Sequence, residues 1–258
     1  MTGSDASPSS FRLAYVPGVT PSKWVRIWNE RLPDVPLTLV PATAAEAPGM
    51  LRDRTADAGL VRLPMDRTGL SAIPLYTETT VVVVPKDHLV AAADEVSSGD
   101  LAEDVVLHPL DDTLDWERPP GLPALERPAT TADAVELVAA GIGLLVVPQS
   151  LARLHHRKDL TYRPLSDVPQ SRVALSWREE ETTPDLVEHF IGIVRGRTVN
   201  STRGPQLTPQ AKAERPEKSG GDRRKPAAGK QAGQGSRRGS GAPKGGRSGR
   251  SGKPRRRS

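Results

Sequence analysis

Phe11-Arg12-Leu13-Ala14-Tyr15-Val16, followed by Pro17-Gly18, is the segment from which the fold can be worked out. Apolar and polar side chains alternate along it, as is typical of a β-strand, and Pro17-Gly18 ends that strand. A helix is expected next, with Thr20 as its N-cap and Pro21 at its first position. Its apolar residues recur at helical spacing on one face, namely Trp24, Ile27, Trp28 and Leu32. The chain therefore begins as a strand followed by a helix.

The same alternation continues toward the C-terminus. Strands are predicted at residues 35–40 and 58–63, with Pro36 placing the first of them at a strand start or sheet edge. A helical segment between them, residues 43–54, is interrupted by Pro48-Gly49. The apolar run Val81-Val82-Val83-Val84 has the composition of a strand buried on both faces of a mainly parallel sheet. This order predicts an α/β fold with right-handed crossovers.

Charge divides the 258 residues into two unlike parts. After Asn200 the sequence holds 17 of the 36 Lys and Arg residues but only 3 of the 31 Asp and Glu residues. The first 200 residues therefore carry a formal net charge of −9, and the rest carries +14. The second part also has 12 Gly, 6 Pro and no aromatic residue, so it cannot bury a core. We expect a disordered basic tail over residues 199–258.

Several classes of chemistry are excluded by composition. The absence of cysteine rules out disulfides, thiolate metal sites and a cysteine nucleophile. The five histidines lack metal-binding spacing, and no nucleophile-elbow, zinc-protease or phosphate-loop motif occurs. We therefore expect no enzyme activity, no catalytic residues, no metal and no cofactor. Without a spanning apolar run or a secretory signal, the prediction is a cytoplasmic protein with no membrane insertion.

Five blocks of sequence occur in a recognisable order. They are Phe11-Arg12-Leu13-Ala14-Tyr15-Val16-Pro17, Arg31-Leu32-Pro33-Asp34-Val35-Pro36-Leu37, Asp57-Ala58-Gly59-Leu60-Val61-Arg62-Leu63-Pro64, Pro74-Leu75-Tyr76 with Lys86-Asp87-His88, and Val138-Ala139-Ala140-Gly141-Ile142-Gly143-Leu144-Leu145-Val146-Val147-Pro148. Together they cover roughly residues 11–197. This series resembles the effector-binding domain of LysR-type transcriptional regulators.

The resemblance implies a type II periplasmic-binding-protein-like fold, in which two α/β subdomains enclose a ligand cleft. Subdomain I would comprise residues 11–81 and 164–198, and subdomain II residues 82–163. Residues 1–10 would be a disordered arm. Members of the family carry a winged helix-turn-helix before this domain, whereas only ten polar residues precede Phe11 in this sequence. We therefore expect a stand-alone effector-binding domain. The family's self-association through sheet edges and helices also implies a homodimer.

Candidate effector residues follow from the expected cleft. Ligands of open α/β sheets bind beyond the carboxyl ends of strands, beside helix N-termini that favour negative charge. This predicts a small carboxylate effector, bound between two helix starts, with an arginine able to pair with it. The candidate residues are Gly18, Thr20, Ser22, Arg62, Pro64, Thr130, Thr131 and Gly143. The alternative is structural: the hydroxyls cap helices, Arg62 is a surface arginine, and the glycines serve backbone geometry.

The expected tail suggests a second partner. Its basic clusters are Arg223-Arg224-Lys225, Arg237-Arg238 and Arg255-Arg256-Arg257, separated by Gly, Ser and Pro. Such a segment favours non-specific, salt-dependent binding to nucleic acid, although a solubilising extension or an anionic surface partner also fits. The leading hypothesis is a small-molecule-sensing regulatory protein involved in transcription regulation. The alternative is a nucleic-acid-associated interaction protein with a vestigial ligand cleft, and a solute-binding transport protein is a third reading.

Overall fold

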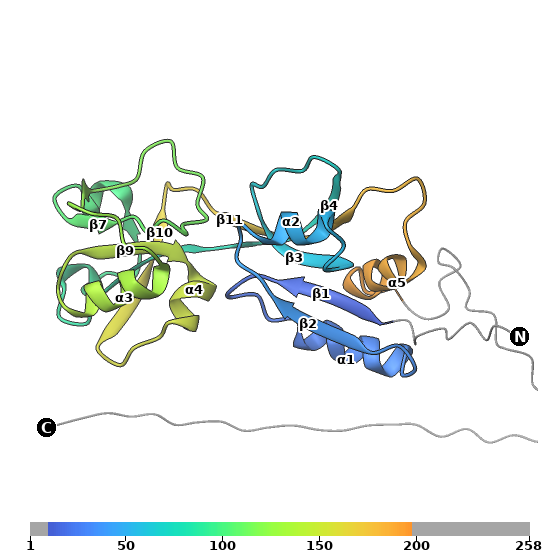
Figure 1. The fold of residues 1–258 in the computed structure, drawn as a ribbon. Coiled ribbons are helices and arrows are strands. Elements are labelled where there is room, and N and C mark those ends of the chain that lie inside the picture. The colour runs from blue at the N-terminus through green and yellow to red at the C-terminus, as the bar shows by residue number, and fades with distance from the viewer. Residues whose placement is uncertain (1–9, 198–258) are drawn as a thin grey trace, which may run out of the picture. The chain divides into compact units, whose positions relative to one another are not determined.

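Two β-sheets organise the part of the chain that the structure describes, residues 10–197 of a computed structural model (Figure 1). The expected arm and basic tail, with the predicted nucleic-acid-binding residues, lie outside the described residues apart from Ser10. Helices pack on both sheets, so the α/β class predicted from the alternating pattern is confirmed.

The first sheet has the strand order β2-β1-β3-β11-β4. β1 is parallel to β2 and β3, whereas β11 is antiparallel to β3 and β4. With helices α1, α2 and α5 it forms what we call the first subdomain. Its elements are β1 (Phe11–Tyr15), α1 (Ser22–Arg31), β2 (Leu37–Pro41), α2 (Ala47–Arg52), β3 (Ala58–Leu63), β4 (Leu70–Glu78), β11 (Ser171–Arg178) and α5 (Asp185–Val194).

The second sheet has the strand order β6-β10-β5-β9-β7-β8, and helices α3 and α4 pack on one of its faces. We call this part the second subdomain. Its elements are β5 (Thr80–Pro85), η1 (Leu89–Ala92), β6 (Val96–Ser97), η2 (Ser98–Leu101), β7 (Val105–Leu107), β8 (Leu122–Pro123), α3 (Thr131–Ala139), β9 (Leu144–Pro148), α4 (Gln149–Leu154) and β10 (Leu160–Ser166).

The chain crosses between the two sheets twice. It passes from β4 to β5 at Thr79 and returns from β10 to β11 through residues 167–170. The division predicted from sequence, at residues 81/82 and 163/164, falls within β5 and β10 and stays a prediction. Both crossings are short, so residues near them belong to one subdomain while lying close to the other.

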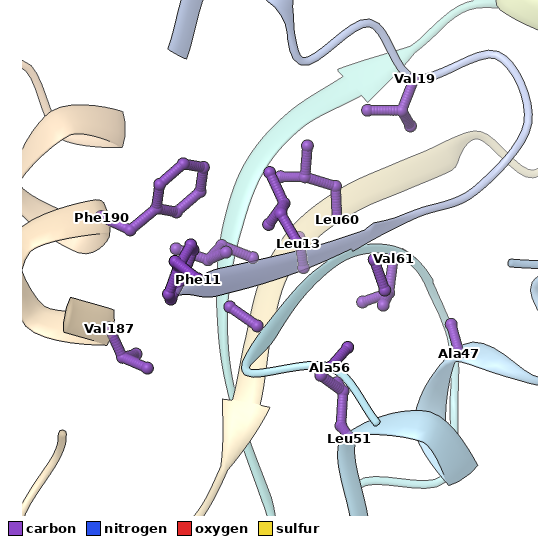
Figure 2. Close-up of a cluster of buried hydrophobic side chains, with 14 of the residues drawn as sticks. Phe11, Leu13, Val19, Ala47, Leu51, Ala56, Leu60, Val61, Val187 and Phe190 are labelled. Atoms are coloured by element: carbon purple, nitrogen blue, oxygen red, sulfur yellow. The ribbon is translucent and has the colours of Figure 1, made fainter. Parts of the chain in front are cut away.

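An aromatic cluster anchors the core of the first subdomain. Phe11 stacks on Trp28 with ring centroids 4.6 Å apart, and Phe190 packs against both rings. Figure 2 shows Phe190 and Val187 of α5 beside Phe11, where β1 begins. Trp28 is fully buried, and its indole N–H donates to the Val35 carbonyl at 2.9 Å. The helical face predicted around Trp28 therefore packs into this core.

Two local expectations need correction. Pro21, and not Thr20, is the N-cap of α1, and no side chain caps this helix. Pro48-Gly49 does not interrupt α2, because Pro48 lies in the first turn, where a missing N–H does no harm. β5 is buried in a mainly parallel sheet, as predicted, although β5 itself runs antiparallel to both of its neighbours, β9 and β10.

Candidate effector cleft

A cleft of about 690 Å³ opens between the two subdomains. One wall lies at the carboxyl ends of β1 and β2, and the other is the helix α4. Ligands of α/β proteins commonly bind at this end of the strands. The lining residues are Tyr15, Pro17, Gly18, Val19, Thr20, Pro41, Ala42, Thr43, Glu46, Ser150, Arg153 and Leu154. The cleft is mostly apolar and carries a few polar groups, as small-molecule sites usually do.

One carboxylate on the cleft wall belongs to Glu46, which forms three hydrogen bonds with Thr43. The Thr43 N–H and hydroxyl donate to Glu46 Oε2 at 3.1 and 2.8 Å, and the Glu46 N–H donates to the Thr43 hydroxyl at 3.2 Å. The bonds from Thr43 hold the pKa of Glu46 below its ordinary value. Glu46 is therefore ionised at neutral pH, and the one cation on the lining, Arg153, balances its charge.

A buried arginine lies directly behind the cleft. Arg62, at the end of β3, is only 4% exposed, and its guanidinium pairs with Glu78 Oε2 at 2.5 Å. The Glu78 side chain is itself only 9% exposed. Glu78 ends β4, one residue before the chain crosses to the second subdomain. The pair is thus a buried salt bridge beside the crossing.

Further hydrogen bonds extend this pair into both subdomains. Arg62 Nη1 also donates to the Ser171 hydroxyl at 2.7 Å, and Nη2 donates to the Pro17 carbonyl at 3.1 Å. Nη2 reaches the Ser150 hydroxyl of α4 at 2.9 Å, and that hydroxyl donates to Glu78 at 3.1 Å. All four Nη hydrogens of Arg62 are therefore used. We call Arg62, Glu78, Ser150 and Ser171 the Arg62 network.

The structure brings three of the predicted effector residues to this region. Gly18 and Thr20 line the cleft, and Arg62 lies behind it in the network. Pro64 is exposed just after β3. Ser22 borders a separate hollow on α1 with Val25, Arg26 and Leu39.

The remaining predicted residues have structural partners in the second subdomain. Thr130 is the N-cap of α3, accepting a hydrogen bond from the Asp133 N–H at 3.1 Å. Thr131 is buried and donates to Asp111 at 2.9 Å. Gly143 has a φ of +92°, and a Cβ there would lie 2.6 Å from the Val105 carbonyl oxygen. None of these residues lines the cleft, so their effector roles stay predictions.

Comparison with known proteins identifies the architecture. The family model described as the LysR substrate binding domain matches residues 8–198. The chain belongs to the LysR substrate-binding family. The oxidised form of OxyR superposes with a TM-score of 0.61 and 21% identity, covering 73% of this chain and 95% of that one. A BenM effector-binding domain with its effector benzoate gives a TM-score of 0.61 at 19% identity, covering 74% and 92%. These likenesses confirm the predicted type II periplasmic-binding-protein-like fold.

Curated relatives of this LysR domain are gene activators. A probable hydrogen peroxide-inducible genes activator of Mycobacterium leprae is 32% identical over 58% of this chain, which spans 52% of that protein. Its counterpart from Mycobacterium avium is 27% identical over 79% of this chain and 70% of that protein. The family and these relatives are regulators of transcription and not enzymes, as predicted from the missing motifs. Within residues 10–197, no helix is long and apolar enough to cross a membrane.

Sequence reasoning missed most of the polar groups of this LysR cleft. Thr43 and Glu46 fit the Ser/Thr-x-x-Glu helix-start pattern, so a scan for that pattern could have found them. Glu78, Ser150 and Ser171 lie 16, 88 and 109 residues from Arg62, and no local pattern links residues so far apart. Only the fold brings them together.

Gly18 offers a test of how tightly the cleft wall is packed. Its φ is +84°, and an added Cβ would lie 2.4 Å from the Ser150 Oγ and 3.0 Å from Arg62 Nη2. Gly18→Ala should lower the free energy of unfolding by about 1–3 kcal/mol, since it adds backbone strain and displaces the network. Gly69→Ala is the control, because its φ is +68° but the space around it is open. Urea denaturation that shows equal losses for both variants would contradict this packing.

Proposed function

We propose that this chain is a small-molecule-sensing regulatory protein whose LysR domain takes its effector in the cleft between the subdomains. The observation that supports this most is the position of the cleft at the carboxyl ends of β1 and β2, facing α4. Binding there contacts both subdomains at once, so it can bias their relative arrangement. We infer a role in transcription regulation and, accordingly, a cytoplasmic site of action.

We propose that this chain senses its signal by binding an effector and not by oxidation of a thiol. Several relatives are named for induction by hydrogen peroxide, and OxyR is represented in oxidised and reduced forms. Peroxide sensing through a thiol needs a reactive cysteine. The 258 residues contain no cysteine. A disulfide switch within this chain is therefore excluded. The cleft provides a site at which a small molecule can be sensed instead.

A small-molecule screen tests the proposal. Compounds of different charge would be added to the full chain, and its thermal midpoint would be measured. Leu154→Trp narrows the cleft from an exposed lining position and should abolish stabilisation by any true effector. Leu125→Trp is the matched control, because Leu125 is fully exposed and lies outside the cleft lining. The proposal fails if Leu154→Trp retains every wild-type response, and the alternative with a vestigial cleft is then favoured.

We further propose that the basic segment after Asn200 binds nucleic acid without sequence preference. The support is its net charge of +14 and its lack of aromatic residues for base stacking. If about 8 cations contact phosphates, the slope of log K against log salt should be about −7. Fluorescence anisotropy with duplex DNA and RNA would compare the full chain with a version ending at Asn200. Equal binding by both proteins, or a slope near zero, would refute this role.

A further inference from the structure

The Arg62 network restricts the charge of the molecule that the cleft can hold. We propose that Glu78 is a built-in counter-carboxylate that occupies the anion position of Arg62 and thereby selects an uncharged effector. This inference rests on the proposed function, because it concerns the ligand of the same cleft. It replaces the small carboxylate expected from the sequence with an uncharged, hydrogen-bonding molecule.

Arg62 has no free hydrogen-bond donor left on Nη1 or Nη2. Its four Nη hydrogens are used by Glu78, Ser171, the Pro17 carbonyl and Ser150. A ligand carboxylate could accept a hydrogen bond from Nη1 or Nη2 only by displacing one of these acceptors. Glu78 is the strongest of them, because its carboxyl group forms a salt bridge with Arg62 at 2.5 Å.

Burial of the Arg62–Glu78 pair disfavours a second anion beside it. The side chains of Arg62 and Glu78 are 2% and 9% exposed, so water screens their charges poorly. The pair is already neutral, and a second carboxylate beside it would leave a like-charged, poorly solvated pair of anions. Glu46, whose pKa is lowered by its bonds from Thr43, adds a further negative charge on the cleft wall, and the exposed Arg153 offsets only that charge. No surplus positive charge therefore remains on the lining.

The Arg62 network also couples the choice of ligand charge to the arrangement of the two subdomains. Ser150 belongs to α4 of the second subdomain, yet its hydroxyl bonds both Arg62 and Glu78 of the first. A carboxylate that displaced Glu78 would also break this bridge. An uncharged ligand can fill the apolar part of the cleft and leave the bridge intact.

The test uses benzoate and benzamide as probes, because they share a ring and nearly the same size but differ in charge. Isothermal titration of the full chain should show benzamide binding about tenfold more tightly than benzoate. Glu78→Gln keeps the size of the side chain and a hydrogen bond from Arg62, but it removes the negative charge that neutralises Arg62. This variant should therefore bind benzoate more tightly than benzamide. Glu30→Gln is the matched control: it also removes one negative charge from the chain, but Glu30 is exposed on α1 outside the cleft lining, so the preference should not change.

A second readout does not depend on the effector. Glu78→Ala leaves Arg62 without its carboxylate, and formate can occupy the vacated position. Formate at 100 mM should raise the thermal midpoint of Glu78→Ala by about 3 °C more than sodium chloride at the same concentration. The wild-type chain should show no such difference, because Glu78 already fills the position.

The two experiments separate failure of this inference from failure of the proposed function. Benzoate binding as tightly as benzamide to the wild-type chain overturns the inference, as does an unchanged preference in Glu78→Gln or the absence of formate rescue. If neither probe binds, the inference about the effector is also overturned. The proposed function fails separately, when formate rescues Glu78→Ala but the Leu154→Trp variant retains every stabilisation that the compounds of the screen give the wild-type chain.

Discussion

Replacing Arg62 by alanine should lower the free energy of unfolding by about 3–5 kcal/mol, because it leaves a buried carboxylate without its partner. Glu78 would lose an ion pair of 2.5 Å, and the hydroxyls of Ser150 and Ser171 would each lose a donor. Urea denaturation followed by tryptophan fluorescence measures the change. A loss below about 1 kcal/mol would show that the network is solvated and not buried.

A double replacement provides the control for this prediction. Arg62→Met with Glu78→Leu removes both charges, and buried ion pairs replaced by apolar residues are often neutral in stability. The double variant should therefore be more stable than Arg62→Ala alone. Additive losses for the two sites would contradict a direct pair.

Trp28→Ala should lower the free energy of unfolding by about 3–5 kcal/mol, the usual range for a large aromatic side chain in a core. Trp28 is fully buried and stacks on Phe11, and its ring centroid lies 5.9 Å from that of Phe190. Its replacement also leaves the Val35 carbonyl without the indole N–H. The expected loss can be measured by urea denaturation followed by circular dichroism.

Trp24 on the same helix is the matched control, because it is only partly buried against the core. Trp24→Ala should therefore cost clearly less than Trp28→Ala, within about 2 kcal/mol. Equal losses would mean that the aromatic cluster does not anchor the first subdomain in the way the structure indicates.

The first subdomain could be predicted well from sequence because its signals are local. The alternation in residues 11–16 and the helical spacing around Trp28 depend on neighbours a few residues apart, and both appear as β1 and α1. Direction was not predictable for β5, because the composition of Val81–Val84 reports burial and not whether the partners run parallel. Pro48-Gly49 was wrongly predicted to interrupt a helix, because the sequence pattern does not show that the helix begins at Ala47, one residue before Pro48.

The candidate site could be predicted only in part. Gly18 and Thr20 were found because ligands bind at the ends of strands, a rule that needs only the position of β1. The wall formed by α4 and the partners of Arg62 depend on contacts across the two sheets. Glu78 in particular changes the role expected for Arg62, because the Arg62 guanidinium is paired with Glu78 in a buried salt bridge and is not free to bind a ligand carboxylate.

The location of effector binding is the central claim, and amide chemical-shift mapping of the full chain tests it most directly. The strongest stabilising compound of the screen would be titrated into isotope-labelled protein. If the effector binds in the cleft, the shifts should be concentrated on both of its walls, at Gly18, Thr20, Thr43 and Ser150. Shifts concentrated instead at the hollow on α1, around Ser22 and Asn29, would contradict it.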